Sequence, residues 1–346
     1  MNFKNICICG GGAQGTVIAG YLSGKGLSVS VLTSRPDEWS KEILVKTCDG
    51  KQIKGCLCCI TGLPELVIPS ADVVLMCLPG FLIRDELEKI KPCLRPKTYV
   101  GSVVSSTGFF FEALKILPPD QPLWGFQRVP FICRVEHYGH SARLLGYKSS
   151  HNIAVENVAD GEKKLFADEV SRLFDGPVRL LKNYWEASLT NSNPILHTAR
   201  LYSMFSAWDG TARSDHNILF YEEWTDESSE LLIRMDREFF EVLKRVPVSE
   251  GFLPPLLEYY ESTDAPSLTR KIRSIKAFKG IKSPMKQVDG GWVPDFSDRY
   301  FTEDFPYGLK LVCQLAGNQE FAHPAVHVPT LEKVCGWGCG IIERKI

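Results

Sequence analysis

Two short segments carry the residue types that acid–base chemistry needs. In the first, N-S-N-P-I-L-H, Asn193 and His197 are four residues apart and would share one face of a helix. Asn193 can cap a helix that begins with Pro194, or Pro194 can kink a longer helix. A single histidine in a mainly apolar segment is more often a hydrogen-bonded core residue than a catalytic one. The first segment alone therefore leaves both interpretations open.

The second segment, S-D-R-Y-F-T-E-D, places Arg299 and Asp304 five residues apart around the start of an expected helix. The planar guanidinium of Arg299 suits a substrate carboxylate. Asp304 is the type of residue that fixes the tautomer of an imidazole and increases its basicity. A dehydrogenase that acts on a keto acid needs a carboxylate clamp, a proton donor and acceptor, and an orienting acid. Together, the two segments predict an active site of that kind.

A third candidate lies near the N-terminus, where G-G-G-A-Q-G matches the pattern G-x-G-x-x-G. Gly10 would let the chain turn, Gly12 would let the backbone approach a pyrophosphate, and Gly15 would let the helix pack closely on the strand. The start of the helix offers free N–H groups to the phosphates. The alternative is a purely structural glycine turn. We predict that a dinucleotide contacts Gly10, Gly12, Ala13, Gln14 and Gly15.

Ser34 and Arg35 follow the second expected strand, where NAD-binding proteins carry Asp or Glu against the ribose 2′-hydroxyl. A hydroxyl and a guanidinium suit a 2′-phosphate instead, whereas a carboxylate would repel it. We therefore expect NADP, as NADPH, in preference to NAD. In the alternative, Arg35 is an exposed loop residue and Asp37 reaches the ribose.

Two later apolar segments, 71–77 and 98–104, have the composition of strands that are buried on both faces of a parallel sheet. Ligands of such sheets bind beyond the carboxyl ends of the strands. The loops 78–81 and 105–109 should therefore flank the cofactor, although a plain turn is an equal alternative for each loop taken singly. We expect Leu78, Pro79 and Gly80 to contact the cofactor.

The elements that would position these residues begin with a strand–helix–strand unit, followed by further strands and one helix. This order predicts an α/β Rossmann domain, doubly wound with a mostly parallel sheet, over residues 1–183. The expected strands are 3–9, 27–33, 71–77, 98–104, two near 122–135 and 151–155, and 178–181; the expected helices are 13–25 and 160–174.

Helical periodicity replaces the strand pattern after residue 183. We therefore expect an all-α second domain over residues 184–346, which would bind the substrate and carry out the catalysis. The basic run 270–286 contains no acidic residue; we interpret it as a solvated face, and the alternative is attraction of an anionic substrate. The expected helices are 185–206, 226–245, 254–261 and 302–316.

The composition limits the classes of protein to which the chain can belong. Its 346 residues suit two domains, and 44% hydrophobic with 23% charged residues is the balance of a globular protein. With 40 basic and 41 acidic side chains, no charge excess favours nucleic acid or an anionic membrane. No apolar run approaches the ~18 residues of a membrane span. Because the first residues also lack the pattern of a signal peptide, we expect a cytoplasmic protein.

The twelve cysteines lie mostly in apolar, strand-like segments, where they would be buried thiols in a reducing compartment. The cluster at 56–59 lacks the C-x-x-C spacing of a zinc or redox site. His323, His327, Cys335 and Cys339 could in principle surround zinc. Nearby prolines, however, would break any helix that aimed both imidazoles in one direction, so we predict no metal site.

Taken together, the motifs resemble those of the opine dehydrogenases, the octopine and nopaline dehydrogenase family. The likeness rests on Asn193 and His197 after a Rossmann domain, and on Arg299 and Asp304 further along the chain. The segment V-P-F-I-C-R (129–134) is also similar to the Pro-x-x-Cys-Arg stretch of the family. The resemblance covers nearly the whole chain, and it implies a helical second domain like the C-terminal domain of 6-phosphogluconate dehydrogenase.

The resemblance also implies an activity. An amino acid and an α-keto acid would condense, and NAD(P)H would reduce the resulting imine, or the reverse oxidation would take place. His197 would be the general acid/base, with Asp304 as its partner. Arg299 would bind a substrate carboxylate, and Asn193 would hydrogen-bond the substrate beside it.

The expected partners are thus small molecules, and a homodimer is the default expectation for a soluble enzyme. The shape of the pocket would determine which amino acid and keto acid react. Tyr202, Phe205 and Trp208 are candidates to line it, because they lie on or just after the expected helix that carries His197.

Two other functions compete with this interpretation. Ketopantoate reductases share the fold and the NADP preference and have a similar helix; Trp185 and Asn191 match it, but Ala187 occupies the position of the catalytic lysine. The other alternative is a dinucleotide-binding sensor without catalytic activity. A sensor has no need for the set of His197, Asp304, Asn193 and Arg299, so convergence of these residues would argue against it.

Overall fold

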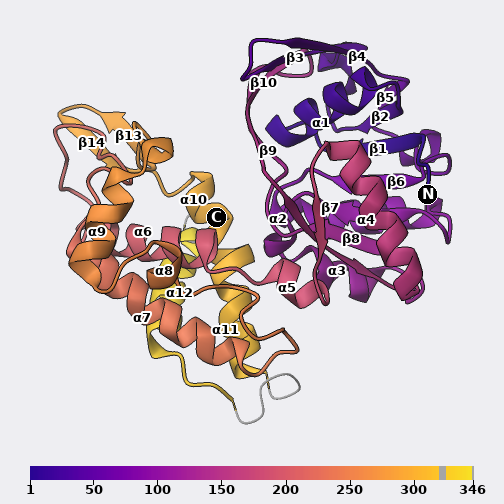
Figure 1. Cartoon of the computed structure of the whole chain (residues 1–346). Helices are drawn as coiled ribbons and strands as arrows, with labels where there is room; N and C mark the ends of the chain where they lie inside the picture. Colours follow the sequence, from indigo (N-terminus) through magenta and orange to yellow (C-terminus); the bar gives the residue numbers. More distant parts are fainter. Residues whose placement is uncertain (319–324, 345–346) are drawn as a thin grey trace. The chain divides into compact units, whose positions relative to one another are not determined.

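The computed structural model describes residues 1–318 and 325–344 and divides the chain into two compact units, Met1–Ser188 and Leu189–Ile346. The sequence pattern predicts the change of domain at residue 183. His323 lies outside the described residues. Figure 1 shows a sheet-containing first unit and a mainly helical second unit, each of which has its own arrangement of elements.

The first unit is built on an eight-stranded sheet, which confirms the predicted Rossmann architecture. Its strand order is β12-β11-β8-β7-β6-β1-β2-β5. Neighbouring strands are parallel, except for the antiparallel pair β8 and β11. The strands are β1 (Asn5–Cys9), β2 (Ser28–Leu32), β5 (Cys59–Thr61), β6 (Val73–Met76), β7 (Tyr99–Ser102), β8 (Leu123–Phe126), β11 (His151–Glu156) and β12 (Val178–Leu180).

Helices cover both faces of this sheet because its strands are apolar on both sides. On one face, Ile6 and Ile8 of β1 pack in the core shared with α1 and α4. On the other face, Cys7 and Cys9 of the same strand are fully buried in the core shared with α2 and α3. These two cysteines are therefore core residues, as predicted. The helices are α1 (Ala13–Gly24), α2 (Gly80–Ile90), α3 (Phe109–Ile116), α4 (Asp160–Phe174) and α5 (Tyr184–Ser188).

A second, four-stranded sheet packs against α1, and most of it is missing from the sequence prediction. Its order is β4-β3-β10-β9, and β3 and β10 are parallel. Glycines on α1 allow the close contact: a Cβ on Gly20 would lie 2.7 Å from Cγ2 of Val45, and one on Gly24 would lie 2.3 Å from Cγ2 of Ile53. The strands are β3 (Glu42–Thr47), β4 (Gln52–Cys56), β9 (Phe131–His137) and β10 (Ser141–Tyr147).

The second unit is helical, as predicted, with one addition. A two-stranded hairpin, β13 (Met285–Val288) and β14 (Gly291–Pro294), begins at the end of the basic run. The predicted helix 185–206 is also interrupted, because α5 ends at Ser188 and a π-helical turn, Ser192–His197, precedes α6 (Thr198–Phe205). The other helices are α7 (Asp226–Leu243), α8 (Leu256–Tyr259), α9 (Ala265–Ser274), α10 (Arg299–Thr302), α11 (Lys310–Gly317) and α12 (Pro329–Glu343).

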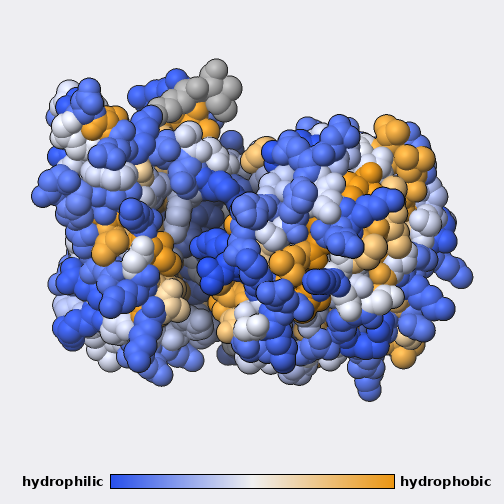
Figure 2. Space-filling model, turned by 90° about the horizontal axis from the view of Figure 1, so that it is seen from above, coloured by the Kyte–Doolittle hydropathy of each residue, from blue (hydrophilic) through white to orange (hydrophobic). Residues whose placement is uncertain are grey.

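Neither a membrane span nor a metal cluster is found among the described residues. None of their helices is both long enough and apolar enough to cross a membrane. No group of three or more His, Cys, Asp or Glu residues in the described ranges could hold a metal ion. On the face seen in Figure 2, hydrophobic residues form patches between mostly hydrophilic residues.

Candidate active site

His197 is held at both ring nitrogens. Its Nδ1 lies 2.8 Å from Oδ2 of Asp304, and its Nε2 lies 3.0 Å from the hydroxyl of Tyr221. An ionised carboxylate only accepts hydrogen bonds, so Nδ1 carries the proton and Nε2 accepts the bond that the tyrosine donates. The carboxylate thus fixes the tautomer that leaves Nε2 basic.

Two π-helical turns bring His197 and Asp304 together. His197 ends the turn Ser192–His197, and Asp304 begins a second turn, Asp304–Leu309. Each turn contains a proline, which cannot donate the hydrogen bond that an α-helix requires. The turns touch at Gly308, where a Cβ would lie 3.0 Å from Cβ of Pro194. Such wide turns often occur at functional sites.

Asn193 and Arg299 are both more exposed than the His–Asp pair. The Asn193 side chain is exposed within the π-helical turn that ends at His197. Arg299 forms a bidentate ion pair with Glu303, with N–O distances of 2.7 and 2.8 Å. Hydrogen bonding to Glu303 raises the pKa of Arg299, and the nearby charge of Asp304 adds to this. The guanidinium fork is therefore already bound to a carboxylate of the protein.

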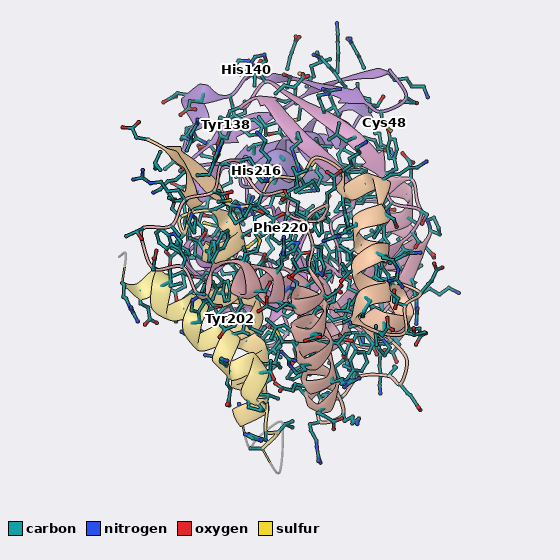
Figure 3. All side chains as sticks on the ribbon, turned by 90° about the vertical axis from the view of Figure 1, so that its left-hand side faces the viewer. Cys48, Tyr138, His140, Tyr202, His216 and Phe220 are labelled. Carbon is teal, nitrogen blue, oxygen red and sulfur yellow. The ribbon has the colours of Figure 1, made fainter. Side chains whose placement is uncertain are left out.

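Tyr221 and Arg200 belong to the same cluster, although neither lies in the predicted catalytic segments. Arg200 is buried, and it donates from Nε to the Phe220 carbonyl (3.1 Å) and from Nη2 to the Glu223 carbonyl (2.7 Å). Phe220, labelled in Figure 3, packs edge-to-face on His197, with 5.6 Å between ring centroids. The aromatic motif F-Y-E-E-W at 220–224 is the signal from which these contacts could have been suspected.

The glycine loop of the first unit has the geometry that a dinucleotide needs. Gly10 has a φ of +102°, and a Cβ there would lie 2.8 Å from the Cys77 carbonyl. A Cβ on Gly15 would lie only 2.0 Å from the Gly10 carbonyl, so helix α1 can start this close to β1 only with glycine. Around Gly12 the space is open to at least 4 Å, which leaves room for an approaching pyrophosphate.

The other predicted cofactor residues surround this loop in different ways. Ala13 begins α1, and Gln14 donates from Nε2 to the Phe131 carbonyl at 2.7 Å, so the amide of Gln14 ties α1 to β9. Leu78 approaches Gly10, where its Cδ2 would lie 2.6 Å from an added Cβ. Pro79 and Gly80 form the start of α2. The glycine loop therefore contacts the loop after β6. That Leu78, Pro79 and Gly80 contact the cofactor stays a prediction.

Arg35 lies over the aromatic ring of Tyr138, a residue outside the predicted cofactor site. Its guanidinium carbon is 3.8 Å from the ring centroid of Tyr138, and Nη1 is 3.2 Å from a carboxylate oxygen of Glu38. Tyr138, labelled in Figure 3, comes from the turn between β9 and β10. Its hydroxyl would lie 2.5 Å from a Cβ on Gly11, so the ring connects Arg35 with the glycine loop. Ser34 is exposed beside it.

Comparisons with known proteins agree with this geometry. The family model described as "NAD/NADP octopine/nopaline dehydrogenase, alpha-helical domain" matches residues 180–341. Octopine dehydrogenase of Pecten maximus is 28% identical and aligns over 96% of this chain and 88% of its own length. Tauropine dehydrogenase of Arabella iricolor is also 28% identical, over 98% of this chain and 92% of its own.

A solved structure of octopine dehydrogenase with NADH and L-arginine covers 98% of this chain and 90% of its own, with 26% identity and a TM-score of 0.83. Over nearly its whole length the chain is thus similar to the opine dehydrogenases. It is therefore an oxidoreductase that uses a nicotinamide dinucleotide and acts on carbon–nitrogen bonds of amino-acid-derived substrates, by reductive condensation or its reverse.

The extent of these similarities argues against both alternative functions. The family model described as "Ketopantoate reductase PanE/ApbA" matches only residues 6–108, within the first unit. Ala187, at the position where a ketopantoate reductase needs its lysine, is fully buried and has no titratable group. Neither the ketopantoate reductase nor the sensor interpretation is favoured for this opine dehydrogenase relative.

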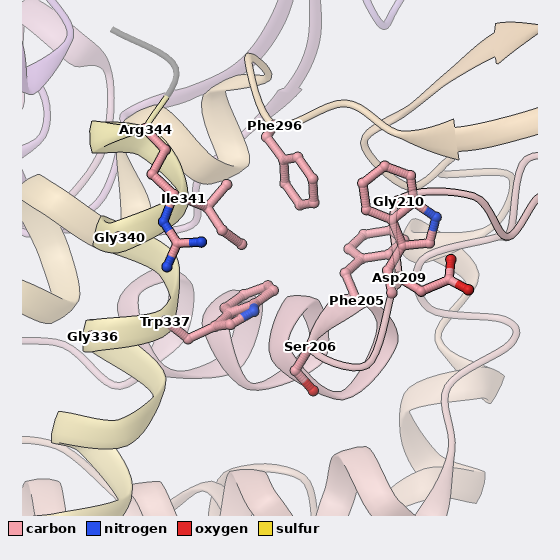
Figure 4. A pocket seen from close by; sticks show the side chains of 11 residues that line it. Phe205, Ser206, Asp209, Gly210, Phe296, Gly336, Trp337, Gly340, Ile341 and Arg344 are labelled. Atoms are coloured by element: carbon pink, nitrogen blue, oxygen red, sulfur yellow. The ribbon is translucent and has the colours of Figure 1, made fainter.

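A pocket of about 590 Å³ lies in the second unit. It is found at the C-terminal end of α6, whereas His197 precedes the N-terminal end of this helix. Figure 4 shows Phe205 and Trp337 at this pocket, with Arg344 at the end of α12. Phe205 and Trp208 line this pocket, and Tyr202 packs edge-to-face on Trp337. That these three residues line the substrate pocket stays a prediction. The buried ring of Phe301 contacts both Phe205 and Trp337.

Proposed function

We propose that this protein is an NADPH-dependent opine dehydrogenase in which His197 and Asp304 form the acid–base pair. The observation that carries the proposal is the 2.8 Å contact between Nδ1 of His197 and Asp304, made by two touching π-helical turns. The contact joins residues from distant segments, and it leaves Nε2 as the basic nitrogen. A core histidine has no need of such a carboxylate.

In the proposed reaction, His197 accepts a proton from the substrate ammonium, so that the free amine can attack the keto carbon. The protonated imidazole then returns a proton to the hydroxyl of the carbinolamine, which leaves as water and yields the imine. The nicotinamide cofactor, when bound, supplies the hydride that reduces the imine carbon. Throughout the cycle, Asp304 stabilises the imidazolium and keeps the ring orientated.

For the substrate carboxylate, we assign Arg299, whose planar fork already binds the carboxylate of Glu303 in a bidentate manner. A substrate carboxylate would take the place of Glu303. Asn193 would contribute its exposed amide as a hydrogen-bonding group beside it. The substrate class is accordingly an amino acid together with an α-keto acid.

The preference for NADP rests on Ser34 and Arg35. A guanidinium that is stacked on Tyr138 is held in place while its outer N–H groups can still bind a 2′-phosphate. Glu38 is half-exposed, so its ion pair with Arg35 is weak and can be exchanged for a phosphate. Asp37 is the competing residue, as a partner for the ribose hydroxyl of NAD.

The remaining predictions concern the location of the enzyme in the cell and its oligomeric state. All twelve cysteines are free thiols, which fits the proposed cytoplasmic location. We keep a homodimer as the expected assembly, and sedimentation of the purified protein would test it.

The experiment that tests the proposed function measures the oxidation of NADPH and of NADH. Pyruvate, 2-oxoglutarate and glyoxylate are each supplied with and without a panel of amino acids. Turnover should require both an amine and a keto acid, favour NADPH, and fall by about 10²- to 10⁴-fold in His197→Ala. Turnover with a keto acid alone would contradict the proposal and indicate a simple keto-acid reductase.

A further inference from the structure

Both nitrogens of the His197 imidazole are occupied by protein groups. Asp304 binds Nδ1 at 2.8 Å, and the hydroxyl of Tyr221 binds Nε2 at 3.0 Å. A general acid/base must exchange a proton with its substrate through one of its nitrogens. Tyr221 must therefore either move away from Nε2 when the substrate binds or conduct the proton itself.

The ring of Tyr221 is packed too firmly to move away. It is only 6% exposed. One neighbour, Phe278, stacks on it with 4.0 Å between centroids and 18° between planes, and Phe220 packs edge-to-face on it at 4.8 Å. Because protein interiors are close-packed, the ring can swing only if these neighbours also move.

The backbone on both sides of Tyr221 is fixed as well. Arg200 donates to the carbonyls of Phe220 and Glu223, which lie before and after the tyrosine. Burial lowers the pKa of Arg200 to about 10, so the guanidinium remains charged and bound at neutral pH. Trp224 adds a backbone hydrogen bond to the Tyr221 carbonyl at 3.2 Å. The hydroxyl is therefore held in position from the ring and from the main chain.

We propose that Tyr221 relays the proton between the substrate amine and His197, a role that rests on the proposed function. The O–H bond of Tyr221 breaks as its proton moves to Nε2, while the same oxygen takes a proton from the substrate ammonium. Tyr221 ends as a neutral phenol, the imidazole has gained one proton, and the amine has its lone pair. The reverse sequence delivers a proton to the departing water, and no electrons change hands.

The two proton transfers must take place together. Burial raises the pKa of Tyr221 far above its ordinary value, and nearby charges, together with a side-chain hydrogen bond to Tyr300, raise it further. A free tyrosinate would therefore be too unstable to act as an intermediate. Tyr300 is half-buried, and its ring lies 4.7 Å from that of His197, so the cluster reaches the partly exposed surface at Tyr300.

Substitution of Tyr221 by Phe tests the relay, because it keeps the ring and removes the hydroxyl. We expect kcat to fall by about 10²-fold or more, the size of a lost acid–base group, with KM nearly unchanged. The dependence of kcat on the D₂O fraction should be curved in the wild type, where two protons move at once, and straight in the variant. A kcat within a few-fold of wild type, or identical D₂O curves, would overturn the relay.

Tyr99→Phe is the matched control. Tyr99 is also buried, stacks on Phe166 with 4.4 Å between centroids, and donates to Glu162 at 2.6 Å. Its substitution removes one buried phenol hydroxyl from the first unit, so it should reduce stability but leave the D₂O dependence as in wild type. A Tyr221→Phe variant that behaved in the same way as this control would show that Tyr221 is only structural.

A spectroscopic measurement separates the relay from the proposed function. If the wild type shows no amine-dependent turnover, the proposed function fails, whereas the bond from Tyr221 to Nε2 can still be observed in the ¹⁵N spectrum of the histidines. A shift of the Nε2 resonance of His197 in Tyr221→Phe supports the relay. An unchanged resonance would overturn it, because the phenol would then not be bound to the imidazole.

Discussion

At the level of single residues, the pairing of Asp304 with Nδ1 of His197 makes a direct prediction. Asp304→Asn keeps the shape but removes the charge, and the amide can stabilise the wrong tautomer of the imidazole. We expect kcat/KM to fall by at least about 10²-fold, which steady-state kinetics would measure. Asp226→Asn, on the exposed first turn of α7, is the control and should retain activity. Equal activity in both variants would remove Asp304 from the proposed mechanism.

The ion pair between Arg299 and Glu303 makes a second prediction. Glu303→Gln removes the carboxylate that competes with the substrate for the guanidinium. Arg299 is largely exposed, whereas the Glu303 side chain is only 13% exposed, so the pair should contribute about 1 kcal/mol, the upper end of the range for exposed pairs. The KM of the keto acid should therefore decrease by about fivefold. Glu241→Gln, which breaks the exposed pair with Lys244, should leave this KM unchanged. An increase in KM would mean that Glu303 orients Arg299 instead of competing for it.

Arg35 makes the third prediction at this scale. Arg35→Ser should reduce the preference for NADPH over NADH by about 10- to 100-fold, because a hydrogen bond to a charged group contributes about 1.5–3 kcal/mol. The ratio of kcat/KM for the two cofactors measures the effect. Arg84→Ser, which removes another exposed arginine of the first unit, is the control. If the ratio is unchanged, the 2′-phosphate is not bound by Arg35.

At the level of secondary-structure elements, α12 supports the turn that carries Asp304. A Cβ on Gly338 would lie 2.1 Å from Cδ1 of the buried Phe305, whereas a Cβ on Gly336 would meet nothing within 4 Å. Gly338→Ala should therefore destabilise the protein by about 1–3 kcal/mol through overpacking, and it should also reduce activity. Gly336→Ala should stabilise the same helix by about 0.5–1 kcal/mol.

Thermal denaturation of both glycine variants measures these opposite shifts. A similar melting temperature for Gly338→Ala and Gly336→Ala would show that Phe305 and its turn do not depend on close contact with α12.

The elements also show what the sequence could and could not predict. Strands β1, β6 and β7 are apolar on both faces, so their pattern indicates a parallel sheet. In the small sheet, paired strands can be distant in sequence, since β3 pairs with β10. The hydrophobic periodicity of a segment does not predict which distant strand will pair with it. Periodicity does not predict the π-helical turns either, because each wide turn depends on a proline and on the contact between Pro194 and Gly308.

At the level of the whole molecule, each unit has its own set of functional residues. All the predicted cofactor contacts lie in the first unit, which has two hydrophobic cores of its own. A chain of residues 1–188 should therefore fold alone and bind NADPH with an affinity within about tenfold of the full chain, which calorimetry would measure. If only the full chain binds NADPH, the second unit must contribute to the cofactor site.

Some site residues could be predicted from the sequence and others could not, depending on the kind of contact that each one makes. The glycines follow from residue types whose roles depend on local geometry. The pairing of His197 with Asp304 joins distant segments, and it is expected from the resemblance to opine dehydrogenases and from the chemistry of a carboxylate beside an imidazole. Tyr221, Arg200 and Tyr138 could not be found in this way, because their positions depend on packing between distant segments. A phenol or a guanidinium has no sequence spacing that identifies its partner.

The position of Tyr138 limits how the proposed preference for NADP could be transferred to another Rossmann protein. Its ring lies beneath Arg35 and its hydroxyl lies close to Gly11, yet it comes from a turn of the small sheet that forms no part of the strand–helix–strand unit. Ser34 and Arg35 grafted into another Rossmann protein would lack the ring that holds the guanidinium. Redesign of the nucleotide specificity must therefore carry the β9–β10 turn along with the segment after β2.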